Sequence, residues 1–205
     1  GGTASDGTTL ESAGGICGTS AGLSGTLTIT NCSNSGTIEG THSGGICGSN
    51  AGLSGTLTIT NCNNSGTITG ENAGGICGTD AGDQKDSTSN FGDVTISYCW
   101  NTGTMNGQYS GGMCGMRLRS GIVKYCYNTG AINGTSSGGI CGNGTANNNN
   151  TSGVAIFNCL SDANGNSEIN QGGITGYNTA VSGGLVNIYN CWVRGNNLTG
   201  GIASH

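Results

Sequence analysis

The chain repeats itself. Residues 44–70 read GGICGSNAGLSGTLTITNCNNSGTITG, and residues 14–40 are almost the same. Each copy holds three runs: a glycine-led run (44–48), a cysteine-ended run (56–62) and a short third run (65–70). Looser copies follow at intervals of about 30 residues, a period that is typical of stacked structural units. The chain is therefore expected to fold as a column of similar coils.

The three runs recur in a fixed order along the chain. The glycine-led run begins at Gly14, Gly44, Gly74, Gly111, Gly138 and Gly172, with a last one at Gly200. The cysteine-ended run ends at Cys32, Cys62, Cys99, Cys126, Cys159 and Cys191. The third run centres on Ile38, Ile68, Met105, Ile132, Ile169 and Leu198.

Each run reads as a short β-strand, because β-branched residues alternate with polar ones and no helical spacing appears. We predict an all-β, three-sided parallel β-solenoid (a β-helix) of about six coils of roughly 30 residues. It forms one domain over residues 1–205, with a partial coil at each end. Leu27 and Ile29, with their counterparts in later coils, should point inward. Asn34, Asn64, Asn101 and Asn128 share one position, where left-handed geometry and bonds between stacked neighbours are expected.

Composition limits the function. The chain has 44 glycines, no proline, and a net charge of −5 with five Lys and Arg residues. Nucleic-acid binding needs clustered positive charge, so no nucleic-acid partner is expected. No apolar run approaches the ~18 residues of a membrane helix, so no membrane insertion is expected either. Eleven cysteines favour an oxidising, extracellular or cell-surface location.

The cysteines alternate between the glycine-led and the cysteine-ended runs, which suggests disulfides. Pairing within each coil is the most economical scheme, and it leaves only Cys191 unpaired. The predicted bonds are Cys17–Cys32, Cys47–Cys62, Cys77–Cys99, Cys114–Cys126 and Cys141–Cys159. Pairing each cysteine-ended run with the next glycine-led run would leave Cys17, Cys159 and Cys191 over. Pairing between stacked coils is also possible geometrically. Within-coil pairing requires bends near Gly18 and Asn31 that turn both thiols inward.

The pattern of GGICG, TITNC and N-S-G-x-I-x-G resembles the GLUG-motif repeats of large surface proteins, which include adhesins and some secreted peptidases. The resemblance covers nearly the whole chain, although Ile-Cys stands where those repeats commonly have Leu-Val. It implies a β-solenoid on a cell surface or in secreted material, and no chemistry. The disulfide framework is not implied by it.

Several positions are candidate sites. Trp100, Tyr127 and Trp192 follow cysteines and should form an exposed binding edge, suited to sugars or a lateral partner. Outward threonines at 26, 28, 30, 56, 58 and 60 resemble the arrays of ice-binding proteins, and fade through Thr95/Ser97, Val123/Tyr125 and Ala155/Phe157. Possible N-glycosylation sequons begin at Asn31, Asn63, Asn133, Asn143, Asn149, Asn150 and Asn197.

Catalysis and metal binding find little support in the sequence. The carboxylates are scattered, and the neighbours His42 and Ser43 should face opposite ways, so they form no catalytic dyad. Four aspartates (Asp80, Asp83, Asp86 and Asp93) cluster near one insertion, but their spacing matches no calcium loop. We therefore expect no enzyme activity, no cofactor and no metal.

The expected function is an extracellular structural or adhesive β-solenoid. Its partners would be other copies of itself in a head-to-tail filament, or neighbouring repeats of a longer chain, because the open ends of a solenoid are templates for further strands. A module that binds a glycan or ice is the alternative.

Overall fold

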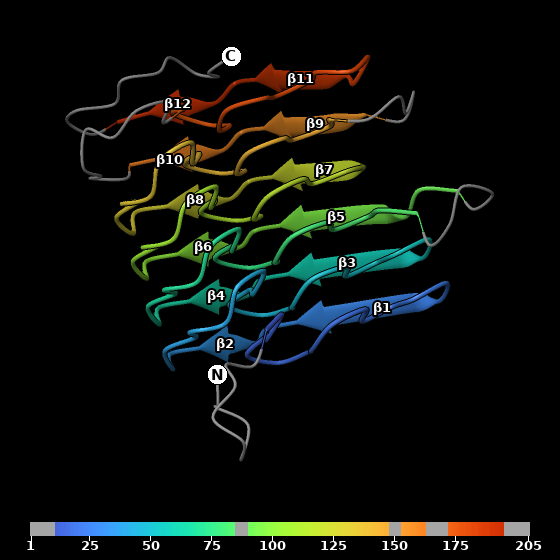
Figure 1. Cartoon of the computed structure of the whole chain (residues 1–205), viewed down its shortest axis with the longest axis horizontal. Helices are drawn as coiled ribbons and strands as arrows, with labels where there is room; N and C mark the ends of the chain where they lie inside the picture. Colours follow the sequence, from blue (N-terminus) through green and yellow to red (C-terminus); the bar gives the residue numbers. More distant parts are fainter. Residues whose placement is uncertain (1–10, 85–89, 148–152, 163–171, 195–205) are drawn as a thin grey trace.

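The computed structural model describes residues 11–84, 90–147, 153–162 and 172–194, and contains only strands, turns and loops in that part of the chain. Twelve strands form two parallel six-stranded sheets (Figure 1). The first sheet holds β1 (Thr26–Thr30), β3 (Thr56–Thr60), β5 (Asp93–Ser97), β7 (Gly121–Lys124), β9 (Val154–Phe157) and β11 (Val186–Tyr189), in that order. The second holds β2 (Ser33–Asn34), β4 (Asn63–Asn64), β6 (Trp100–Asn101), β8 (Tyr127–Asn128), β10 (Leu160–Ser161) and β12 (Trp192–Val193).

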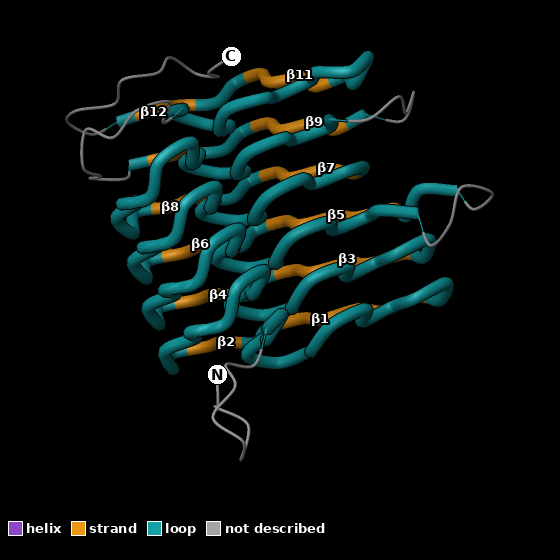
Figure 2. The backbone as a smooth tube through the Cα atoms, viewed as in Figure 1, coloured by secondary structure: helices purple, strands orange, loops and turns teal. Residues whose placement is uncertain are grey.

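Each repeat pairs with the repeats before and after it, as the sequence predicted. Thr28 aligns with Thr58, and Thr58 with Thr95, so one coil lies directly on the next. Isolated parallel bridges continue this register outside the sheets. They link Gly14 to Gly44 and onward to Gly172, and Ile38 through Ile68 and Met105 to Ile132. The backbone trace shows the coils stacked one on another, with loops between the strands (Figure 2). The architecture is of the β-solenoid type. The runs near Ile169, Leu198 and Gly200 lie outside the described residues.

Side chains alternate between inward and outward along the strands of the first sheet, and the inward ones fill the interior. Leu57, Ile59, Val94 and Ile96 are at most 1% exposed and form the main core with the isoleucines of the glycine-led run. A second, smaller cluster gathers the third-run residues Ile38, Ile68, Met105 and Ile132 with Ala73. The predicted inward face is therefore confirmed. In the fourth coil, however, Val123 is buried, and Ile122 and Lys124 continue the threonine face instead of Val123 and Tyr125.

The shared asparagines form a buried column. The amide nitrogen of Asn34 donates to the side-chain oxygen of Asn64 at 2.7 Å, Asn64 donates to Asn101 at 2.8 Å, and Asn101 donates to Asn128 at 2.7 Å. Each also donates to the carbonyl two residues further on, for example Asn101 to Gly103. Bonding between neighbours is thus confirmed.

The expected left-handed geometry at these asparagines is wrong, because they are strand residues of β2, β4, β6 and β8. The left-handed residue lies three positions earlier, immediately before the cysteine. Its φ is between 52° and 57° in all six coils: Asn31, Asn61, Tyr98, Tyr125, Asn158 and Asn190. Two successive residues then face outward, and the cysteine returns to the interior. The bend that the sequence required near Asn31 is present.

Candidate functional site: an aromatic groove above two thiol columns

Two columns of mostly aromatic residues border the corner between the two sheets. The first column holds Tyr98, Tyr125, Phe157 and Tyr189, and the second holds Trp100, Tyr127, Leu160 and Trp192. In the first column the Tyr98 and Tyr125 rings are nearly parallel, with their centroids 5.0 Å apart. The rings of Phe157 and Tyr189 are also nearly parallel, with their centroids 5.2 Å apart. In the second, Trp100 and Tyr127 stack at 6.0 Å. The binding edge predicted at Trp100, Tyr127 and Trp192 lies on one column, interrupted by Leu160.

A groove of about 520 Å³ lies between the columns in the last three coils; we call it the aromatic groove. Its lining residues are Tyr125, Cys126, Tyr127, Asn158, Cys159, Leu160, Asn190 and Trp192. Trp192 is 73% exposed, and Tyr125 and Tyr127 are about two-fifths exposed. Asn158 and Asn190 are exposed, while the two cysteines form the buried floor. None of these lining residues is charged.

The sequence places Tyr98, Tyr125 and Tyr189 in the region of the predicted edge, whereas it assigns Phe157 to the threonine face. Phe157 and Tyr189 lie two residues before their cysteines, whereas Tyr98 and Tyr125 lie one residue before theirs. Counting back from the cysteine therefore places Tyr189 opposite Lys124 and not opposite Tyr125. The Tyr125 and Phe157 rings nevertheless meet edge to face, with centroids 6.0 Å apart. The register of the strands likewise pairs Phe157 with Lys124, so the contact between these rings is visible only in the placement of the side chains.

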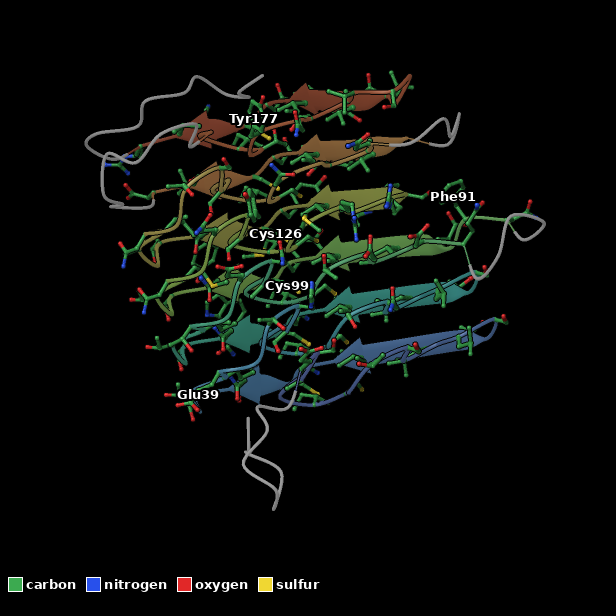
Figure 3. All side chains as sticks on the ribbon, in the orientation of Figure 1. Glu39, Phe91, Cys99, Cys126 and Tyr177 are labelled. Carbon is green, nitrogen blue, oxygen red and sulfur yellow. The ribbon has the colours of Figure 1, made fainter. Side chains whose placement is uncertain are left out.

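The cysteines form two columns inside the coils (Figure 3 labels Cys99 and Cys126). In the first column parallel bridges join Cys17, Cys47, Cys77, Cys114 and Cys141 in succession, and Thr175 takes the next place. In the second, the strand registers on both sides of each cysteine align Cys32, Cys62, Cys99, Cys126, Cys159 and Cys191.

All eleven cysteines are free thiols in this structure, so the predicted bonds Cys17–Cys32, Cys47–Cys62, Cys77–Cys99, Cys114–Cys126 and Cys141–Cys159 are not confirmed. The thiols of the second column donate to backbone carbonyls, for example Cys99 to those of Ser97 and Ile59, and Cys191 to those of Tyr189 and Ile156. Burial raises the pKa of Cys62 to about 11, which keeps this thiol protonated at neutral pH.

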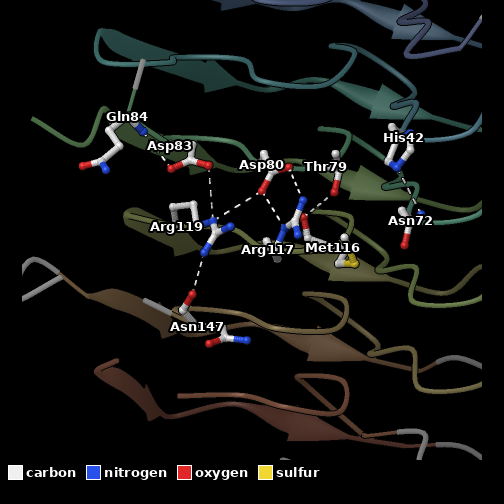
Figure 4. A network of polar contacts seen from close by, with 10 residues as sticks. All are labelled: His42, Asn72, Thr79, Asp80, Asp83, Gln84, Met116, Arg117, Arg119 and Asn147. Carbon is white, nitrogen blue, oxygen red and sulfur yellow. Dashed lines mark hydrogen bonds and ion pairs between the residues drawn. The ribbon is translucent and has the colours of Figure 1, made fainter. Parts of the chain in front are cut away.

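Charged side chains gather at another edge, where they join three coils (Figure 4). Arg117 donates two hydrogen bonds to the carboxylate of Asp80, at 2.7 and 2.6 Å. Arg119 lies 3.3 Å from Asp80 and 3.5 Å from Asp83, and also donates to the carbonyl of Asn147. These carboxylates are neutralised by arginine. Among the described residues no group of three His, Cys, Asp or Glu side chains could hold a metal ion, and Asp86 lies outside them.

The remaining candidates are dispersed. His42 contacts the amide of Asn72 at 3.2 Å, while Ser43 is buried and accepts a hydrogen bond from the backbone of Ala13. Of the sequon asparagines, Asn31 is exposed, Asn63 and Asn133 are half-buried, and Asn143 is 9% exposed. A glycan on Asn143 would need the coil to open. The sequons at Asn149, Asn150 and Asn197 lie outside the described residues.

Searches against protein-family models, curated proteins and solved structures found no match. Kinship with the GLUG-motif repeats therefore stays an expectation, and the function is argued from the geometry alone. In the described part of the chain no helix is long and apolar enough to cross a bilayer.

Proposed function

We propose that this protein is an extracellular adhesive β-solenoid that binds carbohydrate in the aromatic groove. The observation that carries the proposal is an uncharged groove with exposed aromatic rings on both sides and two amides between them. Isolated exposed apolar residues are ordinary on protein surfaces, but a contiguous concave patch is a usual mark of a binding site.

The chemistry of the lining favours a neutral sugar. Aromatic rings cover the apolar faces of a sugar, and the amides of Asn158 and Asn190 offer donors and acceptors to its hydroxyl groups. A charged ligand would find no opposite charge among the lining residues. A glycosidase would need a pair of carboxylates beside the sugar, and the lining has none, which supports binding without hydrolysis.

Backbone strain at the groove gives independent support. Tyr98 and Tyr125 adopt a left-handed φ of 53°, at the position where the four other coils have asparagine. Asparagine tolerates this conformation, whereas a bulky side chain there costs on the order of 1 kcal/mol. Strained residues cluster at functional sites. At Tyr125 this conformation places an exposed ring in the lining of the groove, and Tyr98 stacks on that ring from the preceding coil.

The finer features of the fold belong to the same proposal. The bridges at the glycine-led and third runs supply further contacts between coils outside the two sheets, which supports a three-sided coil. The abundance of cysteine supports the extracellular location. The threonine face supports ice binding less well, because its regular part covers only two coils. In the third coil Asp93 and Ser97 replace two of the threonines, and in the fourth Ile122 replaces the last one.

The test is binding to a glycan array by the wild-type protein and by Trp192→Ala. Trp192 is exposed and lies at the rim of the groove, so its loss should weaken binding about tenfold or more while the fold is retained. Leu185→Ala is the matched control, because Leu185 is also exposed (49%) on the last coil but does not line the groove. Absence of glycan binding by the wild type, or equal loss in both variants, would reject the proposal.

A structural filament is the second candidate, and the sheet edges favour it. β1 and β11 are the edge strands of the first sheet, and their inward residues Leu27 and Val186 are half-buried, whereas Leu57, Val94 and Val154 at the same position of inner coils are buried. A second copy, or further repeats of a longer chain, could add a parallel strand there. Electron microscopy of the native protein should then show continuous fibres with an axial repeat near 29 Å, six coils at about 4.8 Å. Discrete short rods at high concentration would exclude end-to-end stacking.

A further inference from the structure

Three of the cysteines differ from the other eight in solvent access. Cys17, Cys32 and Cys191 are partly exposed, whereas the others are buried. Each of the three has a buried thiol of the adjacent coil beside it in the same column: Cys47, Cys62 and Cys159, respectively. Oxidation of thiols by a dissolved oxidant begins where the oxidant can reach sulfur. The three partly exposed cysteines are therefore the points of entry.

The geometry of these pairs suits a bond between coils. Neighbouring parallel strands lie about 4.8 Å apart, within the usual Cα separation of a disulfide, about 4.4–6.8 Å. The backbone nitrogen of Cys32 lies 3.4 Å from the sulfur of Cys62. The two thiols of each pair also influence each other: Cys159 raises the pKa of Cys191, and burial together with the neighbouring thiol raises the pKa of Cys17 (beside Cys47) and of Cys62 (beside Cys32).

We propose that oxidation joins successive coils through three disulfides, Cys17–Cys47, Cys32–Cys62 and Cys159–Cys191, and does not join the two cysteine-bearing runs of one coil. The first two bonds tie the first coil to the second. The third ties the coil that carries Trp192 to the coil that carries Leu160, across the floor of the aromatic groove. Six of the eleven cysteines would then be oxidised, and the five between them (Cys77, Cys99, Cys114, Cys126 and Cys141) would stay reduced.

The step is a thiol–disulfide exchange with a low-molecular-weight disulfide such as oxidised glutathione. The deprotonated exposed cysteine attacks one sulfur of the oxidant, which forms a mixed disulfide and releases one glutathione thiolate. The neighbouring buried cysteine loses its proton and attacks the protein sulfur of that mixed disulfide, which releases the second glutathione thiolate. Two protein thiols are oxidised, one glutathione disulfide is reduced, and the two protons pass to solvent or to the released thiolates.

Peptide mapping distinguishes this scheme from bonds within coils. The folded protein is treated with oxidised glutathione, its remaining thiols are alkylated under denaturing conditions, and it is cleaved after glutamate. Cleavage after Glu11, Glu39 and Glu71 places Cys17 and Cys32 in residues 12–39, and Cys47 and Cys62 in residues 40–71. Bonds between coils link these two peptides covalently, and bonds within coils leave them separate. Linked peptides carrying Cys17–Cys47 and Cys32–Cys62 are the expected result.

Cleavage after aromatic residues tests the third bond, because it separates residues 158–177 from residues 190–192. These peptides should be linked through Cys159 and Cys191. Cys191→Ser should form two bonds in place of three, with Cys159 alkylated, while Cys114→Ser should still form all three. Unlinked peptides 12–39 and 40–71, an alkylated Cys191 in the oxidised wild type, or full alkylation of all eleven cysteines would overturn the proposal.

Discussion

Replacing Gly78 by alanine should destabilise the protein by at least about 3 kcal/mol, and the variant should be largely unfolded at moderate denaturant concentrations. An alanine Cβ at this position would lie 2.1 Å from the carbonyl oxygen of His42 and 3.0 Å from the backbone of Gly48, both in the preceding coil. Backbone atoms cannot move aside as the tip of a side chain can. The coils would have to separate, and the hydrogen bonds between them would be lost.

Gly18 provides the control for Gly78, because it holds the same place in the first coil. An alanine Cβ there meets nothing within 4 Å. Gly18→Ala should change the free energy of unfolding by no more than about 0.5 kcal/mol. Urea denaturation followed by circular dichroism measures both variants. Equal stability of the two would mean that the close stacking of the coils in this structure is wrong.

Asn101→Ala should cost about 3 kcal/mol of stability, the second large effect. Asn101 is fully buried, donates to Asn128 and Gly103, and accepts from Asn64. Alanine removes three hydrogen bonds and leaves buried partners without water to replace them. The same denaturation experiment measures the loss.

Asn34→Ala tests whether burial in the column causes this cost. Asn34 begins the column, is half-buried, and donates to Asn64 without accepting from another asparagine. Its loss should cost about 1 kcal/mol, because water reaches the groups left behind. If Asn34→Ala and Asn101→Ala were equally destabilising, the asparagines would act independently of their neighbours.

The repeat allowed much of the fold to be predicted. The nearly identical sequences at 14–40 and 44–70 favour similar environments, and stacking is the simplest way to provide them. The positions of Ile29, Ile59 and Ile96, the threonine register and the asparagine contacts followed from it. The left-handed position did not, because asparagine stands both before and after the cysteine and propensity alone does not choose between Asn31 and Asn34. The backbone bend before each cysteine decides that choice.

The candidate site was only half predictable for a related reason. Trp100, Tyr127 and Trp192 have the same offset from their cysteines, so their shared column is visible in the sequence. Phe157 and Tyr189 are shifted by one residue relative to Tyr125, so counting from the cysteine does not reveal that the Phe157 ring contacts both Tyr125 and Tyr189. The spacing of the aspartates already argued against a calcium loop, but the sequence could not show that Arg117 and Arg119, more than thirty residues from Asp80 along the chain, contact it in space.

The most direct test of carbohydrate binding in the aromatic groove uses the chain's own fluorescence. Trp100 and Trp192 are its two tryptophans, and both lie on the second column. In Trp100→Phe, Trp192 at the rim of the groove is the sole reporter. Titration with a neutral oligosaccharide that the wild type selects from a glycan array should shift and saturate its emission, with the same midpoint as binding measured calorimetrically. Calorimetric binding with unchanged Trp192 emission would place the sugar elsewhere and contradict this account.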